Sequence, residues 1–82
     1  MKINLRKSAI KDLRKISSVE KKRIHSKIQI LTDFPNISGC KKLTNFEPAY
    51  RLRVGNYRIL FDVINDNIEI ARVLHRRESY KN

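Results

Sequence analysis

The strongest constraint on the fold is a run of alternating apolar and polar residues from 50 to 63, interrupted by the pair Gly55-Asn56. A period of two is typical of a β-strand, and Gly-Asn between two such runs favours a two-residue hairpin turn. The sequence therefore predicts an antiparallel hairpin with a definite register: Val54 opposite Tyr57, Arg53 opposite Arg58, Leu52 opposite Ile59, and Tyr50 opposite Phe61.

This register gathers three arginines on one face of the hairpin. Because successive side chains of a strand alternate between faces, Arg51, Arg53 and Arg58 lie together, opposite the apolar residues. Directly opposed like charges destabilise a sheet, whereas guanidinium groups match a phosphate bound between them. The spacing is compatible with an anion-binding face and equally with a solvated basic face that has Asp62 as its local counter-ion.

Two helices are expected before the hairpin, after a short first strand at Ile3–Leu5. Ser8 is a suitable N-cap for the first helix. Ser17 and Glu20 have the spacing of a capping box and open the second helix, which Pro35 ends. Together the helices predict an antiparallel helical hairpin, and each has one apolar stripe: Ala9, Leu13 and Ile16 in the first, Ile24, Ile28 and Leu31 in the second.

The segments around the hairpin predict a loop, a third strand and a polar tail. Residues 36–48 contain Asn36, Gly39 and Pro48 and indicate a connecting loop. A turn at 65–67 leads into a strand from Ile68 to about Leu74. The apolar parity of this strand slips, so we expect a β-bulge or a strand that is apolar on both faces. Residues 75–82 form the tail.

Length and charge bound the class of protein. A chain of 82 residues forms a single domain, 1–82, and its net charge of +11 and pI near 10.3 favour polyanionic partners. The same charge is compatible with a basic surface that has no function.

No apolar run approaches the roughly 20 residues of a membrane helix, and the N-terminus lacks a signal-peptide pattern. The single Cys40 excludes an internal disulfide and a cysteine-based metal cage. We expect a cytoplasmic protein without a membrane partner, metal or cofactor.

The tail carries residues suited to nucleic-acid chemistry. The end of the third strand lies near the Gly55-Asn56 turn in an antiparallel sheet, which brings His75, Arg76, Arg77 and Tyr80 toward Arg58. Arginine stabilises charge that develops on a phosphate, histidine moves protons near neutral pH, and tyrosine stacks on bases. A frayed basic terminus is the alternative interpretation.

The strings YRLRVGNYRILF and RVLHRRESY, in this order after the segments KDLRKI and RIHSKIQILTDFP, closely resemble the RelE/ParE superfamily of bacterial and archaeal toxins. The resemblance covers nearly the whole chain. It implies an α+β domain with the order β-α-α-β-β-β, in which a small antiparallel sheet packs on a two-helix hairpin, as in microbial ribonucleases.

The resemblance also implies an activity, which is metal-independent cleavage of mRNA in the ribosomal A site by attack of the 2′-OH on the adjacent phosphate. The family's basic positions correspond to Arg51 and Arg53, its transition-state arginine to Arg58, its proposed general acid to Arg76 and its base-positioning tyrosine to Tyr80. Further basic residues are expected to bind RNA: Arg77, Lys81, Lys41 and Lys42.

One departure from the family concerns proton transfer. Some members have lysines where this chain has Arg51 and Arg53, and arginine is hardly able to accept a proton. His75 is the obvious substitute acid or base, although its ring can equally cap the end of the sheet. His25 lies off the apolar stripe of its helix and is expected on the surface.

The implied partners are the ribosome with its mRNA and an acidic, RelB-like antitoxin, and DNA is contacted only through that antitoxin. Two other functions stay open. A ParE-like DNA gyrase inhibitor shares the fold and cleaves no RNA, and a non-catalytic or decayed RNA-binding module fits the replacement of lysine by arginine.

Overall fold

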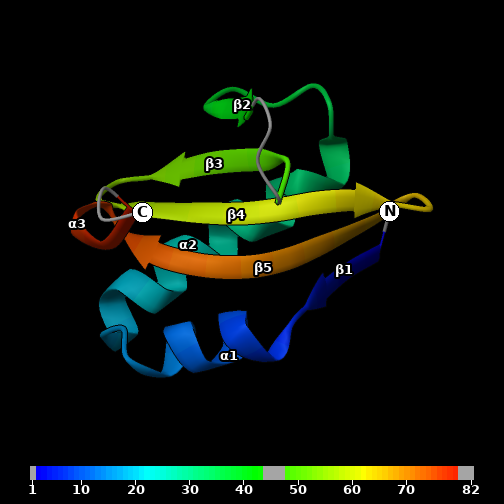
Figure 1. Cartoon of the computed structure of the whole chain (residues 1–82). Helices are drawn as coiled ribbons and strands as arrows, with labels where there is room; N and C mark the ends of the chain where they lie inside the picture. The colour runs from blue at the N-terminus through cyan, green and yellow to red at the C-terminus, as the bar shows by residue number, and fades with distance from the viewer. Residues whose placement is uncertain (1, 44–47, 80–82) are drawn as a thin grey trace.

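The computed structural model describes residues 2–43 and 48–79. One mixed sheet of five strands forms its centre, in the spatial order β1-β5-β4-β3-β2 (Figure 1). The elements follow one another as β1 (Lys2–Leu5), α1 (Lys7–Arg14), α2 (Ser18–Gln29), the short 3-10 helix η1 (Ile30–Asp33), β2 (Cys40–Lys42), β3 (Tyr50–Val54), β4 (Tyr57–Ile64), β5 (Asn67–His75) and α3 (Arg76–Ser79).

The hairpin of β3 and β4 has the register expected from the alternation. Val54 lies opposite Tyr57, Arg53 opposite Arg58, and the pairs continue to Tyr50 and Phe61. Gly55 has a φ of +57°, in the left-handed region that such a turn requires and glycine adopts without a Cβ clash. The turn between β4 and β5 has positive φ at both Asn65 and Asp66, which again fits a two-residue hairpin.

The irregular alternation of apolar residues in β5 corresponds to a β-bulge. Leu60 of β4 pairs with Arg72 and Phe61 pairs with Ile70, so Ala71 is an extra residue between them. The strand is also apolar on both faces, because Ala71 and Leu74 are buried as well as Ile70. Both of the expected explanations therefore hold together.

Four expectations about the elements are wrong. The segment 36–48 contains strand β2, which pairs with β3, and the tail begins with the end of β5 and the helix α3. The sheet is not wholly antiparallel, since β1 pairs with β5 in parallel. Ser8 does not cap α1: it lies inside the helix and its hydroxyl donates to the Ala71 carbonyl at 2.5 Å. In each case a contact distant in sequence overrides the local pattern.

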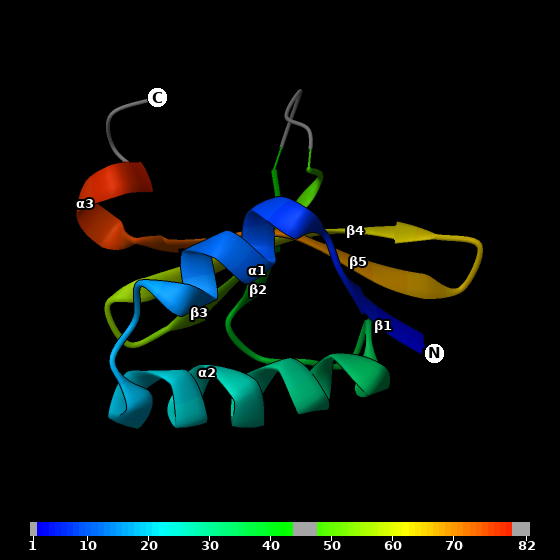
Figure 2. The same cartoon turned by 90° about the horizontal axis from the view of Figure 1, so that it is seen from below.

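The helices cover one face and one edge of the sheet. Figure 2 shows α2 lying under the sheet and α1 beside β5, and Figures 1 and 2 agree that the two helices run in opposite directions, as the sequence predicted. Ser17 caps α2 by accepting a hydrogen bond from the Glu20 amide at 3.4 Å. The core between α2 and the sheet includes Ile24, Leu31, Leu52, Ile59, Phe61 and Ile70.

Within residues 2–43 and 48–79, α2 does not cover the opposite face of the sheet, which we call the open face (Figure 2). Arg51, Arg53 and Arg58 alternate with the core residues and therefore point to this face, away from α2. None of the helices in the described residues is both long enough and apolar enough to cross a membrane.

Candidate active site

Three arginines meet at the Gly55-Asn56 turn. Arg53 and Arg58 face each other across the hairpin, and Arg76 begins α3 directly after β5. They line a shallow cavity of about 180 Å³ together with Gly55, Asn56 and Tyr57. We call Arg53, Arg58 and Arg76 the arginine cluster. A cavity of this size suits a small anionic group such as a phosphate rather than a whole nucleotide.

Backbone contacts hold Arg76 beside the turn. Its amide donates a hydrogen bond of 2.7 Å to the Asn56 carbonyl, and Leu74 pairs with Arg58 on the neighbouring strand. The start of α3 is thus fixed to the same turn that sets the pairing of Arg53 with Arg58. The expected convergence of the third strand's end on this turn is confirmed.

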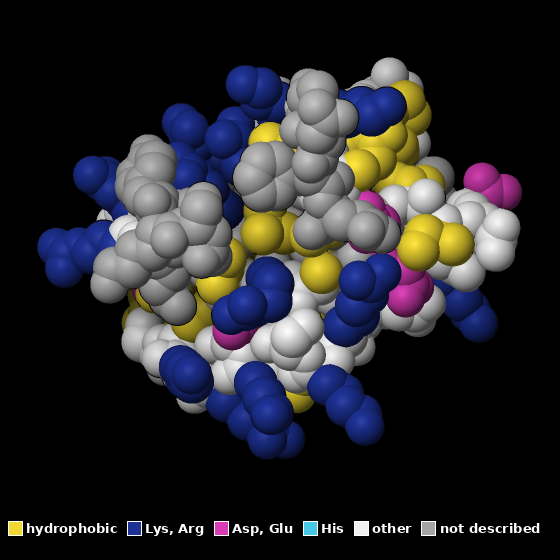
Figure 3. Space-filling model, viewed as in Figure 1, with side chains coloured by type: hydrophobic (Ala, Val, Ile, Leu, Met, Phe, Trp, Pro, Cys, Tyr) yellow, Lys and Arg dark blue, Asp and Glu magenta, His cyan; other side chains and the backbone are white. Residues whose placement is uncertain are grey.

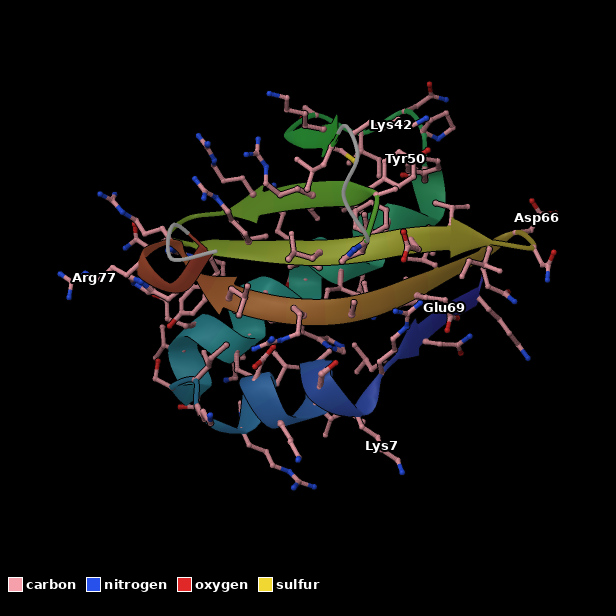
Figure 4. All side chains as sticks on the ribbon, viewed as in Figure 1. Lys7, Lys42, Tyr50, Asp66, Glu69 and Arg77 are labelled. Carbon is pink, nitrogen blue, oxygen red and sulfur yellow. The ribbon has the colours of Figure 1, made fainter. Side chains whose placement is uncertain are left out.

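Lys41 and Arg51 extend the positive charge on the open face beyond the cluster. Lys41 of β2 lies opposite Arg51, which forms a second like-charged pair on this face. The neighbouring Lys42 lies opposite Tyr50 and belongs to the other face, at the edge of the sheet (Figure 4). The structure therefore brings Lys41 toward the cluster and does not bring Lys42.

Arg23 approaches the cluster from α2, and no pattern in the sequence singles it out. A β-carbon built on Gly55 would lie 3.3 Å from Arg23 Nη1, so this guanidinium reaches the turn. It also lies 4.0 Å from the Glu20 carboxylate. On a helical wheel Arg23 is simply off the apolar stripe, and only the packing of α2 under the hairpin reveals its position.

Acidic residues gather at the opposite end of the same face. Asp62 accepts a hydrogen bond from the Ala49 amide at 2.6 Å and lies 3.7 Å from the Arg6 guanidinium. Glu69 pairs across the sheet with Asp62 and accepts from the Asn4 side chain. Asp62 therefore interacts with Ala49 and Arg6. The expectation that Asp62 is the local counter-ion of the arginines is not confirmed.

The surface view shows this separation of charge. Lys and Arg side chains gather at the upper left of Figure 3, toward the ends of β3 and β5. In Figure 4 Arg77 lies at that end and points away from the sheet, whereas Asp66 and Glu69 lie toward the other end. An anion on the open face is therefore drawn toward the arginine cluster.

His75 does not join the arginine cluster. It pairs with Tyr57, whose side chain is on the helix-covered face, and its ring contacts the Tyr57 ring edge-on at a centroid distance of 5.2 Å. Its Nδ1 accepts a hydrogen bond of 3.2 Å from the Arg77 amide. His25 is exposed on α2, as expected, with its Nε2 3.3 Å from the Gln29 side chain. Tyr80 and Lys81 lie outside the described residues.

The pKa of the Cys40 thiol is affected by burial and by a nearby arginine. Burial raises the pKa of the Cys40 thiol, and the positive charge of Arg51 offsets part of this rise.

Within residues 2–43 and 48–79, no group of three or more His, Cys, Asp or Glu side chains is placed to hold a metal ion.

The described lining of the cavity contains three guanidinium groups and neither a carboxylate nor an imidazole. Such a lining is suited to binding an anion and to stabilising negative charge that develops on it. Fold and cluster together define a small basic α+β domain whose open sheet face carries guanidinium groups suited to binding an anion.

Comparisons with known proteins agree with this description. The family model described as "ParE toxin of type II toxin-antitoxin system, parDE" matches residues 3–80. Toxin RelE3 of Methanocaldococcus jannaschii is 36% identical over 84 residues, which cover 98% of this chain and 96% of that protein. The chain belongs to the RelE/ParE superfamily of type II toxin–antitoxin toxins.

Solved structures share the fold. A chain of the RelB–RelE antitoxin–toxin complex from Methanococcus jannaschii superposes with a TM-score of 0.80 at 34% identity, over 95% of each chain. The isolated E. coli RelE toxin superposes with a TM-score of 0.75 at 20% identity, over 98% of this chain and 95% of that one. The fold class expected from the sequence is confirmed.

Proposed function

We propose that this toxin is a ribosome-dependent endoribonuclease that cleaves mRNA in the A site, in the cytoplasm where translation occurs. The observation that carries the proposal is the arginine cluster. Arg53 and Arg58 are held opposite each other although like charges destabilise a sheet, and a bound phosphate relieves that repulsion. Arg76 lines the same cavity, so the phosphate is surrounded by cations from three segments of the chain.

The proposed reaction is attack of the 2′-OH on the adjacent phosphorus. A bond forms between the 2′-oxygen and phosphorus as the 2′-OH proton passes to a solvent water molecule, and the bond to the 5′-oxygen breaks. Arg53 and Arg58 stabilise the charge that builds on the phosphoryl oxygens, and Arg51 adds to the field on the same face. Arg76 supplies a proton to the leaving 5′-oxygen, and Tyr80 stacks on a substrate base.

The RNA on either side of the reacting phosphate needs further cations. Lys41 lies on the open face beside Arg51, and Arg77 and Lys81 follow Arg76 along the chain. We assign these residues to the RNA backbone, where each phosphate contact adds affinity that falls with salt. The proposed reaction uses no metal ion or organic cofactor.

The test is a translation-coupled cleavage assay. The purified chain is added to ribosomes paused with a defined codon in the A site, and primer extension maps the cut. We expect cleavage within that codon, with 2′,3′-cyclic phosphate and 5′-OH ends, and none in free mRNA. A 2′-deoxy nucleotide directly 5′ of the cut should abolish cleavage, because it removes the nucleophile. An intact message on the paused ribosome would overturn the proposal.

A gyrase inhibitor is the second candidate, because the family model that matches residues 3–80 is the one described as a ParE toxin. In that case the same preparation leaves the message intact and traps covalent gyrase–DNA complexes in a supercoiling assay. A chain that binds RNA, cuts no message and traps no gyrase would instead be a non-catalytic RNA-binding module.

We further propose an acidic, RelB-like antitoxin as partner, through which the pair contacts DNA. A relative of this chain was solved in complex with RelB. The net charge of +11 attracts an acidic protein, and an apolar groove of about 290 Å³ between β1, α1 and α2 offers a seat for its side chains. The lining of the groove includes Ile3, Leu5, Leu13 and Ile28, with Lys21 beside them.

Co-expression with the acidic product of an adjacent gene tests the partner and the groove. We expect a stable complex that weakens with salt, and Leu5→Asp should lower its affinity by at least tenfold. Ile64→Asp is the matched control, since Ile64 is similarly exposed but does not line the groove. Equal effects of the two substitutions would show that the groove is not the contact surface.

A further inference from the structure

His75 occupies the junction between β5 and α3, one residue before Arg76. Its chemistry allows two roles, since an imidazole can transfer a proton or accept a fixed hydrogen bond. The surroundings of the ring distinguish these roles.

The hydrogen bonds at this junction are those of a helix start. The first amides of a helix have no partner within it, and an N-cap side chain supplies one by accepting from the second or third residue. The Arg76 amide donates to the Asn56 carbonyl at 2.7 Å, and the Arg77 amide donates to His75 Nδ1 at 3.2 Å. His75 therefore occupies the N-cap position of α3.

The described lining of the cavity does not include His75, although Tyr57, its neighbour across the sheet, belongs to that lining. In the β4–β5 register His75 lies opposite Tyr57, on the face that α2 covers, whereas Leu74 lies opposite Arg58 on the open face. The edge-on contact with Tyr57 at 5.2 Å holds the ring there. Nδ1 carries no proton while it accepts from Arg77, so the neutral ring has its proton on Nε2.

We propose that His75 is a positioning residue that caps α3 and thereby holds Arg76 in the arginine cluster, and that it transfers no proton in the reaction. The inference deepens the proposed nuclease function and rests on it for the cleavage readout. It is carried by two features of this chain, the Nδ1 hydrogen bond to the Arg77 amide and the placement of His75 on the face opposite Arg58.

Two substitutions separate capping from proton transfer. Asparagine is a favoured N-cap whose side-chain oxygen can accept from the Arg77 amide, but it cannot act as an acid or base near neutral pH. Alanine has no acceptor. We expect His75→Asn to cleave within about twofold of the unmodified chain and His75→Ala to lose roughly fivefold, the factor for one lost cap. His25→Ala, at an exposed histidine of α2, is the matched control and should leave both cleavage and Arg77 exchange unchanged.

Amide hydrogen exchange supplies a readout that does not depend on activity. Exchange at Arg77 should be faster in His75→Ala and unchanged in His75→Asn, since only alanine removes the acceptor. If the unmodified chain does not cleave mRNA, the proposed function fails while the exchange data still test the cap.

Two results would overturn the inference. Loss of 10²-fold or more in His75→Asn, with Arg77 still protected, is the size expected for removal of a general acid or base and would assign proton transfer to His75. Equal Arg77 exchange in the alanine variant and the unmodified chain would show that the Nδ1 contact does not hold α3.

Discussion

Arg58 is the residue on which the proposed chemistry depends most directly. It is half-buried, lies opposite Arg53 and pairs with Leu74 in β5, which places it in the middle of the arginine cluster. A charge that is already oriented needs no reorganisation when negative charge develops on the phosphate. Arg58 therefore gives the sharpest single-residue test.

We predict that Arg58→Ala lowers the cleavage rate by about 10²- to 10³-fold, as for removal of one oriented donor in a transition-state site. The melting temperature should change little, because the side chain points away from the core. Single-turnover cleavage and circular dichroism are the measurements, with Lys11→Ala in α1 as the control. Cleavage within threefold of the unmodified chain would place the active site elsewhere.

The Arg53–Arg58 pair predicts a trade-off between stability and activity. Arg53→Glu replaces a repulsive cross-strand pair by an attractive one, which is worth about 0.5 kcal/mol or more. We expect a higher melting temperature together with loss of cleavage, since the new carboxylate repels the phosphate. Thermal denaturation and the cleavage assay are measured on the same preparation. A variant that is less stable as well as inactive would contradict the interpretation of this pair.

At the scale of elements, α1 completes the edge of the sheet that β1 leaves unpaired. β1 pairs with β5 only as far as Ile70. Beyond that point Ser8 donates to the Ala71 carbonyl, and Asp12 accepts from the Val73 amide at 2.9 Å and from Arg72 Nε at 2.8 Å. An edge strand with open backbone groups is a site of aggregation, and here helical side chains satisfy those groups.

Asp12→Ala should therefore destabilise the fold by about 2 kcal/mol, since it leaves the Val73 amide and the Arg72 guanidinium without this acceptor. For a chain of this size the melting temperature should fall by about 10 °C. Urea denaturation is the second measurement, and the exposed Asp33→Ala is the control. An unchanged midpoint would mean that water replaces the carboxylate at no cost.

The sequence predicted those elements whose signals are local. Alternation fixed the β3–β4 register and the arginine face, and Ser17 marked the start of α2. Ser8 carries the same local signal and misleads, because its hydroxyl is taken by Ala71 in a strand 63 residues away along the chain. The parallel pairing of β1 with β5 is equally non-local, and β2 has too few residues to show a period.

Some residues of the candidate site follow from local sequence signals, and others depend on contacts between distant segments. Arg53, Arg58 and Arg76 follow from alternation and from the direction of the strands. The different faces of Lys41 and Lys42 follow only from the pairing of β2 with β3, and the approach of Arg23 only from the packing of α2. The role of His75 depends on one hydrogen bond that no spacing of residues predicts.

At the scale of the whole molecule, the charge of +11 is distributed unevenly over the open face. One end holds the arginine cluster, and the other holds Asp62 and Glu69. The RNA of the proposed function would therefore be attracted by the molecule as a whole and oriented by the difference between its ends. Salt should weaken both effects.

Lys41 and Lys42 provide a matched test of this orientation. Both are exposed and adjacent in β2, but only Lys41 shares the face of Arg51. We predict that Lys41→Ala lowers the affinity for single-stranded RNA and reduces the slope of log K against log salt by about 0.7, the value for one phosphate contact. Lys42→Ala should leave the slope unchanged. Fluorescence anisotropy over a salt series is the measurement, and equal slopes in the two variants would contradict the assignment.

The bulge at Ala71 has a consequence for how chains of this family can vary in length. Because Ala71 is the extra residue between two regular stretches of the β4–β5 ladder, its removal would leave Leu60 opposite Arg72 and Phe61 opposite Ile70. The arginine face would keep its composition, whereas the contact of Ala71 to Ser8 would be lost. Natural insertions and deletions of one residue within this strand should therefore concentrate at the position of Ala71. Anywhere else in β4 or β5 they would turn side chains of the open face toward the core.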